Sequence, residues 1–437
     1  MNKKTRSILI GIMLIVMCCV VLVSCNNDKV SYFDYTKKDM GLVGQLIYWM
    51  RSWIGNYGWT VVVFTVFLKL IMLPLDFWQR YSARKSAVKM QKMQPLLDGI
   101  DKRYGANTQR ANEEKQKLYK KQGYSMLSSC LPMIISMAVF FIMFSGLRHY
   151  STYSSVNMFR ILSDQYYDTY YDKVLSLEES DEIRSTYMSV YNERYSEKLA
   201  ELKKDNPDIN EEKAEYEAKL AGKIGGTLAI ADSEFGRTTN GEAIEAIKAR
   251  YESDIRESWL WIHNVWQPDT WATVMPKYDD RYNSFKQQVN MTGYPDKDGG
   301  ETTYNIIRGA ILETGSYGKN GTWNGLMILP IVSVGLSFLS MWLSQFLENR
   351  NRKKAGVETS QNQQQAMTNK IMMIMMPLMM AYFGFIYTGA FAIYMVVNYM
   401  TSIISTVALR VPVEKLVQKN LAKGDKKDKN SKASYMR

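Results

Sequence analysis

The chain has 437 residues, a hydrophobic fraction of 46%, a mean hydropathy of −0.26 and a formal net charge of +12. These averages would suit a soluble protein of two or three domains, but the apolar residues gather in runs near bilayer length, separated by segments dense in Lys and Glu. Four cysteines and two histidines speak against a disulfide framework, a zinc site and histidine-based catalysis. The sequence therefore predicts no cofactor, no metal and no enzyme.

The first 24 residues have the pattern of a lipoprotein signal peptide. A basic start at residues 3–6 precedes an apolar stretch over residues 8–23. The segment Leu22-Val23-Ser24-Cys25 then resembles a bacterial lipobox, in which cleavage before the cysteine leaves a thiol for lipidation. We expect Cys25 to be the lipid-anchored N-terminus outside the cell membrane; the alternative is an uncleaved signal-anchor helix with an incidental cysteine.

Residues 25–57 are predicted to be a lipid-anchored segment that contains an amphipathic helix. Its apolar residues recur at helical spacing. They are Leu42, Val43, Leu46, Ile47, Met50, Trp53 and Ile54. Two interpretations stay open, because such a helix either lies on the membrane surface or packs against protein.

Apolar runs predict an all-α polytopic membrane protein, with a five-helix core, a cytoplasmic helical hairpin and a mainly helical extracytoplasmic insertion. The last run, residues 371–409, is too long for one crossing of a hydrocarbon layer of about 30 Å, which needs about 20 residues. Residues 387–390 supply a break within it. The predicted spans are residues 58–78, 124–147, 326–347, 371–386 and 389–409.

Charge in the connecting segments predicts the orientation of the chain. The hairpin (79–123), the loop 348–370 and the tail 410–437 together carry 26 Lys and Arg against 9 Asp and Glu, a net of +17. The segment 148–325 has 21 Lys and Arg against 30 Asp and Glu, a net of −9. Because short basic loops stay in the cytoplasm, these segments place the C-terminus inside and residues 148–325 outside a bacterial plasma membrane.

The basic C-terminal tail allows two interpretations. Residues 423–432 would contact ribosomal RNA or anionic lipid, or they form a solvated tail that fixes the last helix. In both readings the excess of positive charge is a topology signal, and we expect no DNA partner.

Local signals predict helices on both sides of the membrane. In the hairpin, Pro95 is expected to kink or break the first arm. In the outer segment, Ser176-Leu-Glu-Glu179 resembles a capping box, Asn210 begins a second helix, and residues 241–261 form a third. Residues 279–323, rich in Gly, Asn and Tyr, are predicted to be loop or short strand.

Lys69 is the most informative residue, because it lies near the middle of the first span, where a charge costs about 2.5–3.5 kcal/mol. Asp76 is expected to pair with Arg80 at i+4, which leaves Lys69 without an acidic partner in the spans. This favours a hydrated groove over a lysine that snorkels to the boundary. Further polar positions in the spans are Thr65, Ser136, Ser333, Ser337, Ser340 and Asn398.

Several motifs in chain order resemble the YidC family of membrane protein insertases (YidC/Oxa/Alb type), in its lipoprotein form. They cover about half the chain. They are Asn56-Tyr-Gly-Trp59, Phe67-Leu-Lys-Leu-Ile-Met-Leu-Pro-Leu75, Gln91-Lys-Met-Gln-Pro95, Leu118-Tyr-Lys-Lys-Gln-Gly123, Cys130-Leu-Pro-Met-Ile-Ile-Ser-Met137, Trp259-Leu-Trp261, Gln267-Pro-Asp269, Ile328-Leu-Pro-Ile331, Met376-Pro377, Tyr394 and Asn398.

The resemblance implies an insertase whose positively charged groove, with Lys69 as its charge, receives segments of nascent membrane proteins. Its partners would be these substrates and membrane lipids, and it would act alone or beside the Sec translocon and the ribosome. The chain departs from the family pattern in five ways. Lys69 stands where Arg is usual, and serines at 136 and 337 replace Gln-type residues. Met395 replaces the aromatic residue after the last-helix Tyr, and Met137-Ala138 replaces a Met-Pro pair. The insertion 151–255 is unusually long.

Two alternatives stay open. A transporter or channel would use Lys69 as an anion site, although neither further charges in the spans nor inverted repeats are visible. A partner-binding assembly factor would instead act through the outer helical segment.

Overall fold

The computed structural model describes residues 29–104, 108–121, 126–271, 273–279, 283, 285–286, 289–291, 293–313, 323–354, 378 and 381–435. Within these residues the chain is almost wholly helical. Its strands, β1 (Val30–Ser31) and β2 (Val289–Asn290), pair in parallel over two residues each. The predicted all-α class is therefore confirmed. The predicted signal peptide and Cys25 lie outside the described residues.

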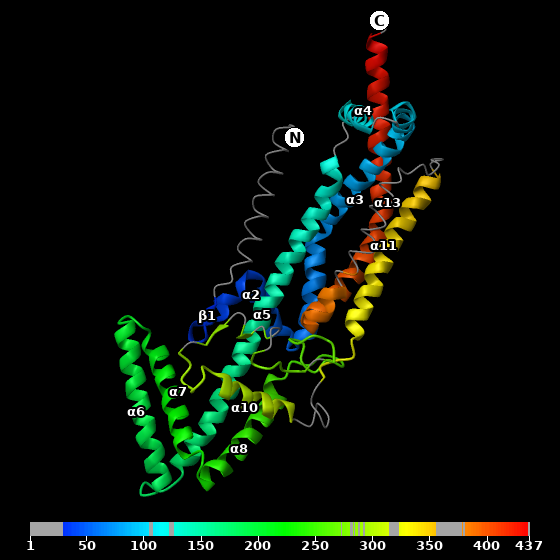
Figure 1. Ribbon diagram of the computed structural model, residues 1–437. Helices are drawn as coiled ribbons and strands as arrows, with labels where there is room; N and C mark the ends of the chain where they lie inside the picture. Colours follow the sequence, from blue (N-terminus) through cyan, green and yellow to red (C-terminus); the bar gives the residue numbers. More distant parts are fainter. Residues whose placement is uncertain are drawn as a thin grey trace.

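Four long helices run side by side as the helix bundle (Figure 1). They are α3 (Tyr57–Tyr104), the first half of α5 (Met126–Leu175), α11 (Ile328–Lys354) and α13 (Gly389–Tyr435). Among the described residues, the stretches long and apolar enough to cross a membrane are Tyr57–Lys89, Ile328–Leu347 and Gly389–Asn420. Most of the predicted fourth span lies outside the described residues, so the count of five spans stays a prediction.

The end of α3 and the helix α4 (Thr108–Lys121) form two arms beyond the bundle. Lys115 Nζ on α4 lies 2.5 Å from Asp101 Oδ1 on α3, which ties the arms together. The helix α3 continues through Pro95 to Tyr104, so of the two expected outcomes the break is wrong, and a kink stays a prediction. A proline removes only one backbone hydrogen bond, and the neighbouring turns of this long helix hold the rest.

The helical domain lies at the other end of the bundle (Figure 1). The helix α5 leaves the bundle without interruption and continues to Leu175. Three helices follow it, α6 (Glu182–Asp205), α7 (Glu211–Ile230) and α8 (Glu234–Arg250), and α10 (Glu301–Leu312) packs beside them. We call the end of the bundle beside these helices the domain end, and the end that carries α4 the tail end.

Side-chain caps fix where the helices of the helical domain begin. Asn210 caps α7 by accepting a hydrogen bond from Lys213 N at 3.0 Å, as predicted. The predicted capping box at Ser176 is wrong, because α6 begins after Asp181, whose carboxylate accepts from Ile183 N at 2.8 Å. A carboxylate there also stabilises the positive end of the helix dipole.

The predicted third helix, residues 241–261, is displaced. Ser233 caps α8 by accepting from Gly236 N at 2.9 Å, so the helix begins earlier and ends at Arg250. A single π-helical turn, Tyr251–Ile255, follows it. The segment 279–323 does contain the short strand β2, but the helix α10 within it was not predicted.

Tyrosines dominate the core of the helical domain, where their rings are buried and several of their hydroxyls are hydrogen-bonded. Tyr166 Oη donates to Asn240 Oδ1 at 2.7 Å, and Tyr294 Oη lies 2.7 Å from Ser163 Oγ. Burial raises the pKa of Tyr166, so these phenols stay neutral at physiological pH. The core is held by ring packing and by hydrogen bonds between elements.

The predicted amphipathic helix is α2 (Gly41–Ile54), which uses two faces. Ile47 is buried, and Val43 packs on α5 at Gly146, where a Cβ would clash with it. Leu42 and Trp53, in contrast, are 87% and 77% exposed. Packing against protein is thus observed for one face, and contact of the exposed face with the membrane stays a prediction.

Candidate functional site

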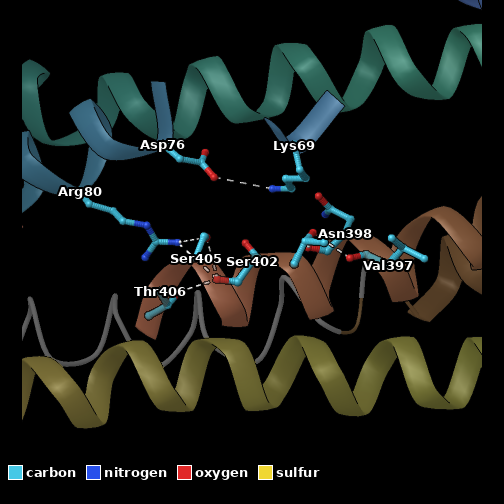
Figure 2. Close-up of polar contacts among 9 residues, drawn as sticks. Lys69, Asp76, Arg80, Val397, Asn398, Ser402, Ser405 and Thr406 are labelled. Carbon is cyan, nitrogen blue, oxygen red and sulfur yellow. Dashed lines mark hydrogen bonds and ion pairs between the residues drawn. The ribbon is translucent and has the colours of Figure 1, made fainter. Parts of the chain in front are cut away.

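The interior of the helix bundle changes character along its length. Towards the domain end, buried apolar side chains of α3, α5 and α13 form one cluster. Its fully packed members include Val61, Phe64, Met143, Phe391 and Ile393. Towards the tail end, charged and hydroxyl side chains line the space between α3 and α13 instead (Figure 2). The bundle interior is therefore closed by apolar packing at the domain end, and it is lined by polar side chains at the tail end.

A loop over residues 259–270 closes the domain end of the bundle. Its carbonyls accept hydrogen bonds from the first turn of α13, Gly389 N to Gln267 O at 2.7 Å and Ala390 N to Val265 O at 2.8 Å. The fully buried Asp269 accepts from Leu329 N at 2.9 Å, at the start of α11. A carboxylate at a helix N-terminus satisfies free N–H groups and opposes the positive helix end. The loop thus joins α11 and α13.

A second ion pair anchors the chain beside this loop. Glu257 binds Arg51 at the end of α2, and its side chain is 11% exposed. Burial raises the pKa of Glu257, and the adjacent guanidinium opposes that shift. The pair fixes α2 to the domain end of the bundle.

Lys69 lies inside the apolar stretch of α3 and faces α13. Its Nζ is 4.0 Å from Asp76 Oδ2, two turns along the same helix, and the two side chains are 24% and 17% exposed (Figure 2). At this separation Coulomb attraction is about 4 kcal/mol at an effective dielectric constant of about 20. That is comparable with the cost of about 2.5–3.5 kcal/mol for one charge at mid-membrane. The expectation that Lys69 has no acidic partner is therefore wrong.

The expected pairing of Asp76 with Arg80 is not what the structure shows. Arg80 reaches across to α13, where its Nη2 donates to Ser405 Oγ at 3.0 Å and to Ser402 O at 3.5 Å (Figure 2). A long guanidinium side chain can satisfy its donors on a neighbouring helix, which a spacing rule within one helix does not consider. Asp76 is left to Lys69.

The other predicted groove residues fall into two groups. The hydroxyls of Thr65, Ser333 and Ser337 are buried and donate to carbonyls of their own helices, at 2.6, 2.8 and 2.9 Å. Asn398 lies on α13 opposite Lys69 (Figure 2). The side chain of Ser136 lies outside the described part of the chain. Lys69 and Asn398 are thus the predicted residues that meet across the interior.

Sequence reasoning missed the polar residues that extend this site towards the tail end. Arg84 forms a bidentate contact with Glu414, from Nε at 2.8 Å and Nη2 at 3.2 Å. Together with Asp76 and Arg80, Arg84 recurs every four residues along one face of α3. This four-residue repeat of charged side chains on α3, together with an acidic residue late in α13, is the sequence signal that would have predicted these polar residues.

Comparison with known proteins gives one family. The model of the family described as 60Kd inner membrane protein matches residues 49–203 and 244–415, which is more than half of the chain. The residues between the matched parts fall in α6, α7 and the first part of α8.

Individual relatives are similar over about a quarter of this chain. A "Membrane protein insertase YidC" from Caldanaerobacter subterraneus subsp. tengcongensis is 33% identical over 129 residues, which is 29% of this chain and 61% of that protein. Proteins of the same name from Xylella fastidiosa and Stenotrophomonas maltophilia are 35% and 34% identical over 116 residues, 25% of this chain and 20% of theirs. The matches therefore span less than two thirds of each relative.

Proposed function

Because the chain belongs to the family of 60Kd inner membrane proteins, we propose that it is a membrane protein insertase. It receives segments of nascent membrane proteins in a hydrated, positively charged groove and helps them insert and fold, alone or with the Sec translocon. The observation that carries this proposal is the half-buried Lys69–Asp76 pair, which lies within an apolar span and faces α13. Charged groups are rare inside membrane spans and mark functional sites there.

The asymmetry of the bundle supports a direction for the process. In the proposed orientation the domain end is outside the cell and the tail end is in the cytoplasm, with the N-terminus lipid-anchored through Cys25. The apolar cluster and the loop 259–270 then close the outer half. The polar residues of α3 and α13 face the side from which a newly made chain arrives. The groove is open to the cytoplasm and closed to the outside.

In this mechanism Asp76 is the resting counter-ion of Lys69. Their 4.0 Å separation is longer than a charge-assisted hydrogen bond, so the pair is held by charge alone. An acidic residue of the arriving segment replaces Asp76 beside Lys69, and the positive charge of Lys69 then compensates its negative charge within the membrane. The exchange trades one ion pair for another and requires no nucleotide hydrolysis. Asn398, across the interior, supplies a neutral hydrogen-bonding group to the same segment.

Complementation of a bacterial cell depleted of its own insertase tests the proposal. Wild type and Lys69→Arg are expected to restore growth, because both keep a positive charge, and Lys69→Ala is expected to fail at equal protein level. Asp76→Asn tests the counter-ion: we expect it to keep activity but to favour acidic substrate segments over neutral ones, because no resident carboxylate then competes for Lys69. Equal growth with Lys69→Ala and wild type would rule out the charge-dependent groove.

A second candidate function is partner binding through the helical domain. A hollow of about 720 Å³ lies between α6, α7 and residues 293–297. At its edge Leu228 is 52% exposed. A photoreactive residue at position 228 of the full chain should crosslink to one discrete protein if this domain recruits a partner. If crosslinking is absent while complementation succeeds, the insertase function stands without it.

A further inference from the structure

A pocket lies between α3, α11 and α13 near the tail end of the bundle. About 210 Å³ of it is open to the centre of a water molecule, well above the ~10–15 Å³ that one water requires. Its wall combines three arginines and one acidic residue with apolar side chains. The charged residues are Arg80, Arg84, Arg410 and Glu414, and the apolar wall includes Leu347 and Val413.

The arginines leave donors that point to an anionic occupant. Glu414 binds Nε and Nη2 of Arg84, but the buried Nη1 of Arg84 has no hydrogen-bond partner among the described residues. Arg80 donates from Nη2 to Ser405, and within the same part of the chain its buried Nε likewise has none. A buried donor left unpaired costs about 1–3 kcal/mol. With a formal excess of two positive charges on the wall, a group with several negative oxygens would satisfy both donors.

The level of the pocket relative to the bilayer indicates the source of this anionic group. From Trp59 to Trp78 the helix α3 rises about 30 Å at 1.5 Å per residue, the thickness of the hydrocarbon layer. Arg80 and Arg84 follow directly, at the level of the phosphates. Leu347, which ends the apolar stretch of α11, and Val413 stand at the same level. Guanidinium groups beside apolar side chains match an amphiphile, not a free ion.

We propose that this pocket binds the headgroup phosphate of an anionic phospholipid. The donors of Arg80 and Arg84 hold the phosphate oxygens, and Leu347 and Val413 contact the glycerol and the first carbons of the acyl chains. The lipid thereby fills the space where the three helices meet. The site requires that the chain spans a membrane, but it does not depend on insertase activity.

Binding to the full chain, purified in a zwitterionic detergent, tests the proposal without any insertion assay. The probes are short-chain phosphatidylglycerol, short-chain phosphatidylcholine and inorganic phosphate at matched ionic strength, and the readout is the dissociation constant from calorimetry. Phosphatidylglycerol is expected to bind at least tenfold more tightly than the other two. Equal binding of inorganic phosphate or of phosphatidylcholine overturns the proposal.

Matched variants locate the site. Arg80→Gln should weaken phosphatidylglycerol binding about tenfold, because one charge-assisted hydrogen bond of about 1.4 kcal/mol is lost. Arg80→Lys, which keeps the charge without the fork, should lie between it and wild type. The control is Arg350→Gln, an exposed arginine of α11 outside the pocket, which should bind as wild type does. Unchanged affinity in a folded Arg80→Gln protein would show that the lipid binds elsewhere.

Discussion

The helical domain and the helix bundle treat their buried hydroxyl groups differently. In the helical domain, hydroxyls bridge elements far apart in sequence: Tyr167 Oη lies 2.8 Å from Thr303 Oγ1, and Tyr170 Oη donates to Gly236 O at 2.9 Å. Each bond joins α5 to another helix. Polar groups in this domain therefore select one arrangement of its helices.

In the helix bundle several buried hydroxyls instead bond within their own helix, although Ser405 Oγ accepts from Arg80 across to α3. Thr65 Oγ1 donates to Val61 O at 2.6 Å, and Ser333 Oγ donates to Pro330 O at 2.8 Å, each within one helix. Contacts between the helices are mainly apolar, with a few polar ones such as Asn420 Nδ2 to Tyr81 Oη at 2.9 Å. The difference teaches that hydrogen bonds between elements fix the arrangement of the helical domain more than that of the bundle.

The largest effect should appear where the two regions meet. Asn324 is fully buried, and its Nδ2 donates to Asn264 O, Gln267 O and Pro268 O, at 2.7, 3.0 and 2.9 Å. Asn324→Ala removes these three bonds and the one that Asn324 Oδ1 accepts from the buried Asn264 N at 2.7 Å, and it should lower the free energy of unfolding by about 3 kcal/mol. Hydrogen exchange of the purified chain measures it, with exchange rising first in the loop 259–270. Asn192→Ala, on the exposed surface of α6, is the control.

The seam between α6 and α7 should show the next largest effect. A Cβ at Gly222 would lie 2.8 Å from the ring of Tyr191 and 2.9 Å from its carbonyl oxygen. Gly222→Ala should therefore cost about 1–2 kcal/mol through overpacking. Gly241→Ala on α8, where a Cβ meets nothing within 4 Å, should instead stabilise by about 0.5–1 kcal/mol. Thermal unfolding of the two variants would contradict a tight seam if both shifted the same way.

A pair of hydroxyl deletions tests the comparison directly. Tyr167→Phe removes the bridge to Thr303 and should cost about 1 kcal/mol. Thr401→Val in α13 removes a bond to Val397 O, which lies in the same helix, and should cost less than about 0.5 kcal/mol. Equal losses in denaturant or thermal unfolding would show that the bundle depends on its hydroxyls as much as the helical domain does.

The last predicted effect concerns pH. Burial raises the pKa of Asp164 to about 6, against a hydrogen bond from Tyr216 Oη at 3.0 Å that lowers it. Since the folded form holds the proton more tightly, this group's contribution to stability is full below about pH 4 and is lost as pH rises through 6. Asp164→Asn should remove that dependence and be more stable at pH 7 by about 1 kcal/mol. Unfolding curves between pH 4 and 7 check it.

Sequence patterns predicted those features that depend on interactions between residues close together in the chain. The cap at Asn210 was correct because the side chain bonds to a backbone group three residues away. The cap at Ser176 failed because Asp181, closer to the actual helix start, offers a carboxylate with two acceptor positions. The all-α class and the family followed from apolar runs and ordered motifs, which need no tertiary information.

The candidate site was harder to predict from the sequence, because its contacts are made between different helices. The i+4 spacing along α3 predicted that Asp76 pairs with Arg80. In the structure Arg80 donates to Ser402 and Ser405 on α13, and Asp76 pairs with Lys69. Which turn of α13 lies opposite Lys69 depends on the register between two helices. A single sequence contains no such register, so the roles of Lys69 and Asn398 stay proposals, and the complementation test decides that of Lys69.

The unbroken helix α5 makes the two regions mechanically continuous. From Leu147 to Leu175 it extends about 42 Å beyond the bundle at 1.5 Å per residue. Such a rod acts as a lever: a tilt of about 10° in its bundle segment would carry its far end, and the helices packed on it, sideways by about 7 Å. A change in bundle packing that tilts α5 would thereby become a displacement of the helical domain.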